Sequence, residues 1–162
     1  MDVESQRIVL REIDPEKDDL RNYLTWMQDT HANPFIESVR VDYSIDELLT
    51  YVRGKNRDVS VILWGIFLRE DHRQIGTIKL EPIDFDLKTA WLGILIGESN
   101  FRGSGYGREA IEAVLSFSKT KLNLIKIYLG VDPANTVALK LYESIGFVNN
   151  PEKQNTLFFN LV

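Results

Sequence analysis

Three glycines within five residues separate an apolar stretch from a helix-like one. Gly103, Gly105 and Gly107 follow the strand-like run Thr89–Gly97 (TAWLGILIG) and precede residues 108–120, whose apolar side chains recur at helical spacing. Because glycine has no Cβ, backbone N–H groups in such a loop can converge on an anion, and the start of the following helix adds about half a positive charge. The pattern predicts a phosphate or pyrophosphate site at this junction; the simpler alternative is a flexible turn that only needs glycine.

Strand-like and helix-like segments follow one another without a recognisable linker. We expect strands at residues 6–12, 60–68, 74–80 (ended by Pro82), 89–97, 125–131 and 156–161, and helices from Asp14-Pro15 towards Met27, from Ser44 to near Gly54, over 108–120 and from Asn135 to Ile145. Three strands form a meander, and strands alternate with helices only in the later half. We therefore predict a single α+β domain over residues 1–162, with a mixed rather than a doubly wound parallel sheet.

Composition excludes several kinds of chemistry. The absence of cysteine excludes disulfides, thiolate zinc sites and cysteine nucleophiles, and the two isolated histidines, His31 and His72, do not make a metal site. A net charge of −5 argues against a nucleic-acid partner. No apolar run approaches the roughly 20 residues that span a bilayer, and no signal segment is recognisable. We expect a cytoplasmic protein with no membrane partner, whose chemistry needs neither thiol nor metal.

Three ligand classes compete for the glycine loop. A nucleotide P-loop requires Lys and then Ser or Thr after the last glycine, whereas Arg108 and Glu109 stand there. A dinucleotide fingerprint fits residues 105–110, with Asp132 further along, but this fingerprint should follow its strand directly and 162 residues leave no room for a substrate domain. Coenzyme A is the third class.

Two motifs favour coenzyme A. Residues 102–107 (RGSGYG) match the pattern Gln/Arg-x-x-Gly-x-Gly/Ala, and residues 131–147 (VDPANTVALKLYESIGF) place an Asn at a helix start, then Ala, then Tyr, then Gly-Phe. With both motifs at this separation, the chain resembles the GCN5-related N-acetyltransferase (GNAT) superfamily over residues 89–147. The resemblance implies a mostly antiparallel sheet of about six or seven strands, flanked by about four helices, with splayed strands that hold coenzyme A.

The resemblance also implies roles for particular residues. The backbone of Ile94, Leu95 and Ile96 would pair with the pantetheine arm of acetyl-CoA like an added strand. Asn135 would approach the coenzyme, and Tyr142 would be the general acid for the departing thiolate. Asn135 and Tyr142 share a helix face, although Tyr142 may be read more simply as a core residue. The pyrophosphate would be wrapped, mostly by main-chain N–H groups, by Arg102, Gly103, Ser104, Gly105, Tyr106, Gly107 and Arg108.

The general base is less defined. Some relatives carry a glutamate in the strand before the second motif, where this chain has Gly130. We take Glu81 as the first candidate. The alternatives are a relayed water, His31, or the loop carboxylates Asp84, Asp86 and Glu98, and each of these side chains can equally be an ordinary surface group. Trp26 and Phe35 belong to the core by default and are secondary candidates for the acceptor cleft.

The predicted function is transfer of acetyl from acetyl-CoA to a primary amine, by direct attack through a tetrahedral intermediate. Residues 22–40 and the helix after them are similar to family members that acetylate nucleotide-linked amino sugars, so this small-molecule acceptor is placed first, with phosphate contacts from Arg40, Arg53 or Lys55. Polyamines, drawn by Glu81, Asp84 and Asp86, are an alternative, as are aminoglycosides and protein N-termini.

Two other classes of function remain open at this point. One is a coenzyme A-binding module without catalysis, and the other is an NAD(P)-binding oxidoreductase. The apolar last strand, Thr156–Val162, is compatible with pairing across a homodimer.

Overall fold

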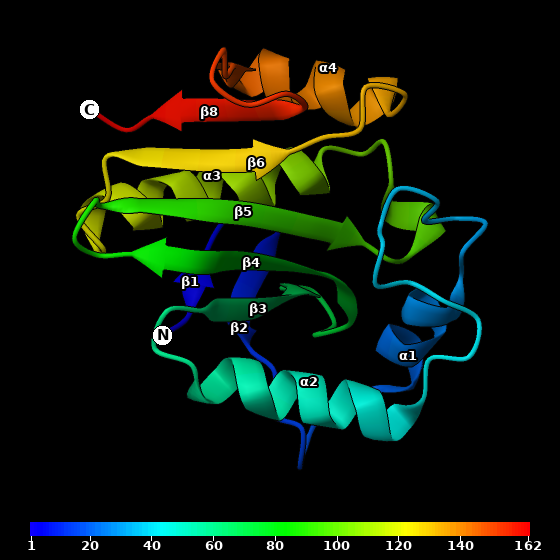
Figure 1. Ribbon diagram of the computed structural model, residues 1–162. Helices are drawn as coiled ribbons and strands as arrows, with labels where there is room; N and C mark the ends of the chain where they lie inside the picture. The colour runs from blue at the N-terminus through cyan, green and yellow to red at the C-terminus, as the bar shows by residue number, and fades with distance from the viewer.

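One sheet of eight strands runs through the computed structural model, which describes residues 1–162 without a gap (Figure 1). The strands are β1 (Val3–Glu4), β2 (Ile8–Glu12), β3 (Ile62–Leu68), β4 (Gln74–Asp84), β5 (Thr89–Ile96), β6 (Lys126–Gly130), β7 (Val148–Asn149) and β8 (Thr156–Asn160). Their order in the sheet is β1-β2-β3-β4-β5-β6-β8-β7, and only β5 and β6 are parallel. The predicted mixed, mostly antiparallel α+β fold is confirmed.

Helices cover both faces of this sheet. The larger core holds 22 buried residues, among them Trp64 and Phe147, and the helices α3 (Tyr106–Thr120) and α4 (Thr136–Ile145) pack into it. The opposite core holds 11 buried residues and receives α1 (Arg21–Gln28) and α2 (Ile45–Arg57). A short 3-10 turn, η1 (Ser99–Phe101), follows β5. None of these helices is long and apolar enough to cross a membrane.

Local sequence signals explain why α2 forms where it does. The Ser44 side chain accepts a hydrogen bond from the Glu47 backbone N–H at 3.2 Å, as its capping-box spacing predicts. Leu48 and Val52 are buried one turn apart on the face that meets the sheet. The helix continues past Gly54 to Arg57, three residues beyond the predicted end, because that glycine is exposed and nothing obstructs the helical path.

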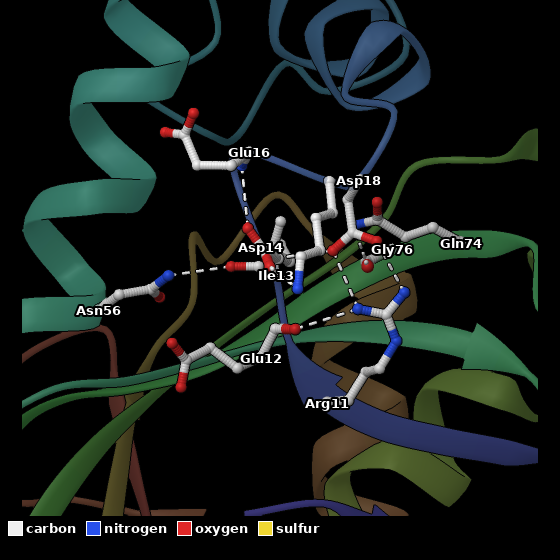
Figure 2. Close-up of polar contacts among 10 residues, drawn as sticks. Arg11, Glu12, Ile13, Asp14, Glu16, Asp18, Asn56, Gln74 and Gly76 are labelled. Carbon is white, nitrogen blue, oxygen red and sulfur yellow. Dashed lines mark hydrogen bonds and ion pairs between the residues drawn. The ribbon is translucent and has the colours of Figure 1, made fainter.

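The helix predicted from Asp14-Pro15 is wrong at its start, since α1 begins only at Arg21. Figure 2 shows the reason: the Asp18 carboxylate turns back to accept hydrogen bonds from the Arg11 guanidinium, at 2.8 and 2.9 Å, and from the Asp14 backbone N–H. The segment therefore closes into a single turn. Asn56 of α2 donates to the Ile13 carbonyl at 2.9 Å and fixes this turn against the second helix.

Two strand predictions also need correction. β4 does not end before Pro82 but continues to Asp84, because a shift in register between Leu80 and Ile83 accommodates a residue that has no N–H to donate. The last strand, β8, offers only part of its outer edge for pairing across a dimer, because β7 covers Leu157 and Phe158, and the homodimer stays a prediction. β8 pairs with β6 on one side and with the two-residue strand β7 on the other.

The parallel pair β5 and β6 separates after three residues. Thr89, Ala90 and Trp91 face Lys126, Ile127 and Tyr128, and beyond this point β5 pairs only with β4. Residues 92–96 thus present a backbone edge without a strand partner inside the sheet. The splayed strands implied by the family resemblance are present.

Trp26 of α1 packs directly on the end of the splayed strand. A Cβ built on Gly97 would lie 2.0 Å from the Trp26 indole, so only glycine permits this contact. The indole is 4% exposed, which makes it a core residue rather than a lining of an open cleft. The contact joins the α1 helix to the start of the glycine loop.

We predict opposite effects for two glycine-to-alanine substitutions. Gly97→Ala should lower the free energy of unfolding by about 1–3 kcal/mol, because the new methyl group must displace Trp26. Gly54→Ala, in the exposed interior of α2 with no atom within 4 Å of the new Cβ, should raise it by about 0.5–1 kcal/mol. Urea unfolding at pH 7 measures both, and a neutral Gly97→Ala would show that α1 does not rest on this contact.

Candidate active site

The cleft between β5 and β6 is bounded by a backbone edge rather than by side chains. The side chains of Ile94 and Ile96 pack against the larger core, and Leu95 is buried in the opposite one. With these side chains engaged on both faces, the peptide groups of residues 94–96 are what the strand offers to a ligand. An extended chain carrying amide groups is the ligand that such an edge can bind.

The glycine loop leads from this edge to the N-terminus of α3. Gly103 and Gly105 have φ values of +71° and +87°, a left-handed conformation that side-chain-bearing residues rarely adopt. Gly105 is the residue before the first helical turn, whose N–H groups have no partners within the helix. A Cβ built on Gly107 would lie 3.7 Å from Leu141, so the same turn packs closely on α4. The loop thus joins two left-handed glycines to the unpartnered N–H groups of a helix start, and the pyrophosphate site stays a prediction.

Arg7 holds this loop in place, and sequence reasoning missed it. Its guanidinium donates to the Ser104 carbonyl at 3.0 Å and to the Glu109 carboxylate at 2.8 Å, and it lies 4.0 Å over the Tyr106 ring centroid. Arg7 precedes β2, 102 positions before Glu109 in the chain. No local pattern marks it, because only the folded sheet brings the two segments together.

Glu109 is the acidic half of this anchor. Its side chain is 13% exposed and also accepts the Arg7 backbone N–H at 2.7 Å. Burial raises the pKa of Glu109, but the hydrogen bonds from Arg7 outweigh that effect and the pKa lies below its usual value. The carboxylate is thus ionised at neutral pH, and the Arg7 guanidinium balances its negative charge. It therefore does not repel an anion at the helix N-terminus.

The two arginines of the motif anchor the loop at its ends. Arg102 donates through Nε to the Ile96 carbonyl at 2.9 Å and through Nη2 to the Asn33 side chain at 3.4 Å. Arg108 donates to the Ser144 hydroxyl and so ties α3 to α4. Arg102 meets no carboxylate, so its positive charge is not cancelled within the chain.

The two predicted residues of α4 take different places. Asn135 caps the helix, and its side-chain oxygen accepts the Ala138 backbone N–H at 3.3 Å. Tyr142 lies against the larger core, 6.0 Å from the Phe147 ring, and its hydroxyl makes no hydrogen bond within the chain. Burial raises the pKa of Tyr142 above its usual value, so the hydroxyl is protonated at neutral pH and can act as a proton donor.

Glu81 is poorly suited to act as a general base. Its carboxylate accepts hydrogen bonds from Lys55 of α2 and, at 2.9 Å, from Lys79. Burial raises the pKa of Glu81, but the two ammonium groups outweigh burial and lower it. A carboxylate held between two cations attracts a proton weakly, which is the opposite of what a base requires.

The other candidate bases are also engaged or exposed. Glu98 accepts from Arg73 at 3.0 Å, and Asp84 caps the following turn by accepting the Leu87 backbone N–H at 2.8 Å. The remaining candidates, Asp86 and His31, are exposed, as are the surface residue His72 and Phe35. The structure brings none of these side chains together with Tyr142, and no three histidine or acidic residues converge on a common metal site.

A hollow of about 560 Å³ opens beside α2, on the face opposite α3. It is lined by Ser38, Arg40, Tyr43, Asp46, Glu47, Thr50 and Tyr51. The three cations proposed as phosphate contacts are each paired with a carboxylate: Arg40 with Glu47, Arg53 with Glu16 and Lys55 with Glu81. Their charges are therefore already compensated, which weakens the case for a nucleotide at this face.

A splayed strand pair that opens onto an anion-binding helix start, with a protonated tyrosine on the next helix, defines an acyltransferase fold of the GNAT type. A family model described as the acetyltransferase (GNAT) domain matches residues 7–148. The chain belongs to this family.

Individual relatives narrow the comparison. The chain is 36% identical over 96 residues to a spermidine N(1)-acetyltransferase of Vibrio cholerae, a match that covers 58% of this chain and 55% of that protein. It thus spans only about half the length of the curated relatives it matches. A crystal structure of spermidine N-acetyltransferase from Vibrio cholerae in complex with CoA and spermine has a TM-score of 0.82 at 25% identity, covering 96% of both chains. A GNAT-family acetyltransferase from Bacillus anthracis, at 17% identity, covers 99% of both with a TM-score of 0.81, which shows the shared fold.

The Arg7–Glu109 anchor predicts a pH-dependent stability. Because the pKa of Glu109 is lower in the folded chain than the roughly 4.3 of an unfolded glutamate, its contribution is fully present above that pH and is lost as pH falls through the folded value. Glu109→Gln should destabilise the protein by about 1–3 kcal/mol at pH 7, and the difference from wild type should shrink in acid.

Urea unfolding at a series of pH values measures this difference. Glu112→Gln, on the same helix with a side chain 54% exposed, is the matched control and should change stability by less than about 0.5 kcal/mol. A Glu109→Gln effect that stays constant down to acid pH would contradict the assigned ion pair.

Proposed function

We propose that this protein transfers the acetyl group of acetyl-CoA to a primary amine of a small cationic acceptor, with polyamines of the spermidine class as the first acceptors to test. The observation that carries the proposal is the backbone edge of residues 92–96, which has no strand partner between the glycine loop and the point where β5 and β6 meet, and on which Arg102 already bonds the Ile96 carbonyl. Unpaired N–H and C=O groups along such an edge can hydrogen-bond the amide groups of a pantetheine arm. Bound acetyl-CoA supplies the thioester whose acetyl group is transferred.

The residues of the chain would divide the work as follows. Gly103 to Arg108 bind the pyrophosphate, chiefly through backbone N–H groups and the helix N-terminus. Tyr142 donates its proton to the sulfur as the carbon–sulfur bond breaks. The attacking nitrogen must arrive as a neutral amine and lose one proton after attack to a water molecule, since the Glu81 carboxylate is engaged by two lysines.

Two observations support a polyamine over the nucleotide-linked amino sugar that the sequence placed first. Proteins similar to this chain include spermidine N-acetyltransferases, and one of their solved structures holds spermine. In addition, the cations that would meet nucleotide phosphates are already paired with carboxylates. The hollow beside α2 offers tyrosine rings and carboxylates, and these groups attract ammonium ions.

A thiol-release assay with the wild-type chain tests the proposal. Acetyl-CoA should yield free thiol with spermidine or spermine, and less or none with a nucleotide-linked amino sugar, an aminoglycoside or an N-terminal peptide. Release with the amino sugar alone would overturn the choice of acceptor. Thermal stabilisation by coenzyme A without thiol release from any amine would instead identify a non-catalytic binding module.

Removal of the Tyr142 hydroxyl tests its role as the acid. Tyr142→Phe should lower kcat by about 100-fold with little change in KM for acetyl-CoA, because the ring still packs against Phe147 while the proton donor is lost. Burial raises the pKa of Tyr142 above that of free tyrosine, so the hydroxyl should keep its proton below about pH 10. Wild-type activity should therefore not fall in that range because Tyr142 ionises. An unchanged kcat would remove Tyr142 from the chemistry.

A further inference from the structure

Lys79 lies across the middle of the splayed strand. It pairs in register with Gly93 of β5, and a Cβ built on Gly93 would lie 3.3 Å from Lys79 Cε and 3.5 Å from Cγ. The Lys79 stem thus occupies the space above Gly93 that another residue would fill. Its ammonium is held at 2.9 Å from Glu81 and at 3.3 Å from the Tyr51 hydroxyl of α2.

An acceptor can approach the splayed segment only from this side. On the other face, Ala90, Leu92, Ile94 and Ile96 pack into the core beneath α3. A pantetheine arm that runs from the glycine loop along residues 96 to 94 ends next to Gly93, so its reactive end lies near Lys79. Tyr51, which contacts Lys79, also lines the hollow that contains Asp46, and this places the hollow and the lysine at one site.

The charge around Lys79 is positive. Tyr51 and Lys55 of α2 face this cluster, Glu81 lies on the same strand, and Gly93 of β5 contributes no side chain. Nearby α1 contributes Tyr23, which is buried and neutral because burial raises its pKa. One carboxylate faces two ammonium groups, so a net positive charge remains beside Gly93. A cation at close range destabilises a second cation, which favours a neutral amine there.

Building on the proposed function, we propose that Lys79 is a positioning residue that keeps the attacking nitrogen of a polyamine in its neutral form, while Asp46 holds a distal ammonium of the same molecule. This arrangement would supply a neutral amine in a chain that has glycine at position 130, where some relatives carry a glutamate, and whose Glu81 is poorly suited to act as a base. Asp46 lies in the first turn of α2 and makes no ion pair, in contrast to Glu47. It precedes Tyr51 by five positions, about 7.5 Å along the helix axis.

Two Lys79 variants separate this role from a structural one. The pH dependence of kcat at saturating spermidine, which reports groups in the enzyme–substrate complex, is measured for wild type, Lys79→Gln and Lys79→Arg. Without the Lys79 charge, the bound amine should keep its proton to a higher pH, and the acidic limb of the pH profile should move about one pH unit towards alkali. Lys79→Gln should then be roughly 10-fold slower than wild type at neutral pH and equal to it at high pH. Lys79→Arg should keep the wild-type limb. Lys119→Gln removes an exposed charge from the last turn of α3 and is the matched control.

The outcomes are distinct. A Lys79→Gln rate that is reduced by the same factor at every pH would mean that Lys79 only ties the sheet to α2, and would overturn the inference. Asp46→Asn should raise KM for spermidine several-fold but not KM for a simple monoamine, and equal effects on both would overturn the role of Asp46. If wild type releases no thiol with any amine, the proposed function fails and this inference fails with it. If wild type is active but the acidic limb of Lys79→Gln does not move, the inference about Lys79 fails and the proposed function stands.

Discussion

The separation of β5 from β6 is the constraint on which the rest of the molecule depends. A strand that leaves its neighbour inside a sheet exposes peptide groups that water, another chain or a ligand must satisfy. On its other side, β5 is paired with β4 along nearly its whole length. Trp26 presses on Gly97 at its far end, and Arg102 caps the Ile96 carbonyl there. These contacts keep open a gap that pairing would otherwise close.

Most charged side chains around this gap are paired with a group of opposite charge, and Arg102 and Asp46 are not. The chain carries a net charge of −5, yet the anion site at α3 meets a glutamate already neutralised by Arg7. Arg102 bonds only to uncharged oxygen atoms and keeps its full positive charge at the loop. On the other face, Glu81 is shared between two lysines, and Asp46 stays free in the hollow. The start of α3 and the hollow beside α2 therefore present different local charges within an acidic protein.

Sequence patterns predicted those parts of the molecule that depend on neighbouring residues. The capping box of α2, the left-handed glycines before α3 and the Asn135 cap of α4 are all local, and each lies where its motif placed it. The start of α1 was wrong because Asp18 finds Arg11, seven residues earlier, across a turn that no periodicity describes. The end of β4 was wrong because pairing with β5 continues past Pro82.

By itself, then, the sequence determined the kind of protein this is. Its glycine loop, its strand and helix order and its second motif require only short-range backbone geometry, and together they specify the fold of the acetyltransferase family that the chain belongs to. Only the tertiary structure decided how charges pair: Arg7 with Glu109, Glu81 with Lys55 and Lys79, and Lys79 over Gly93. Ion pairs between distant segments depend on the register of the sheet and on helix placement. Since a residue's charge in the sequence does not reveal its partner, only the fold showed that Glu81 is held by two lysines and that Arg40 and Arg53 are already paired.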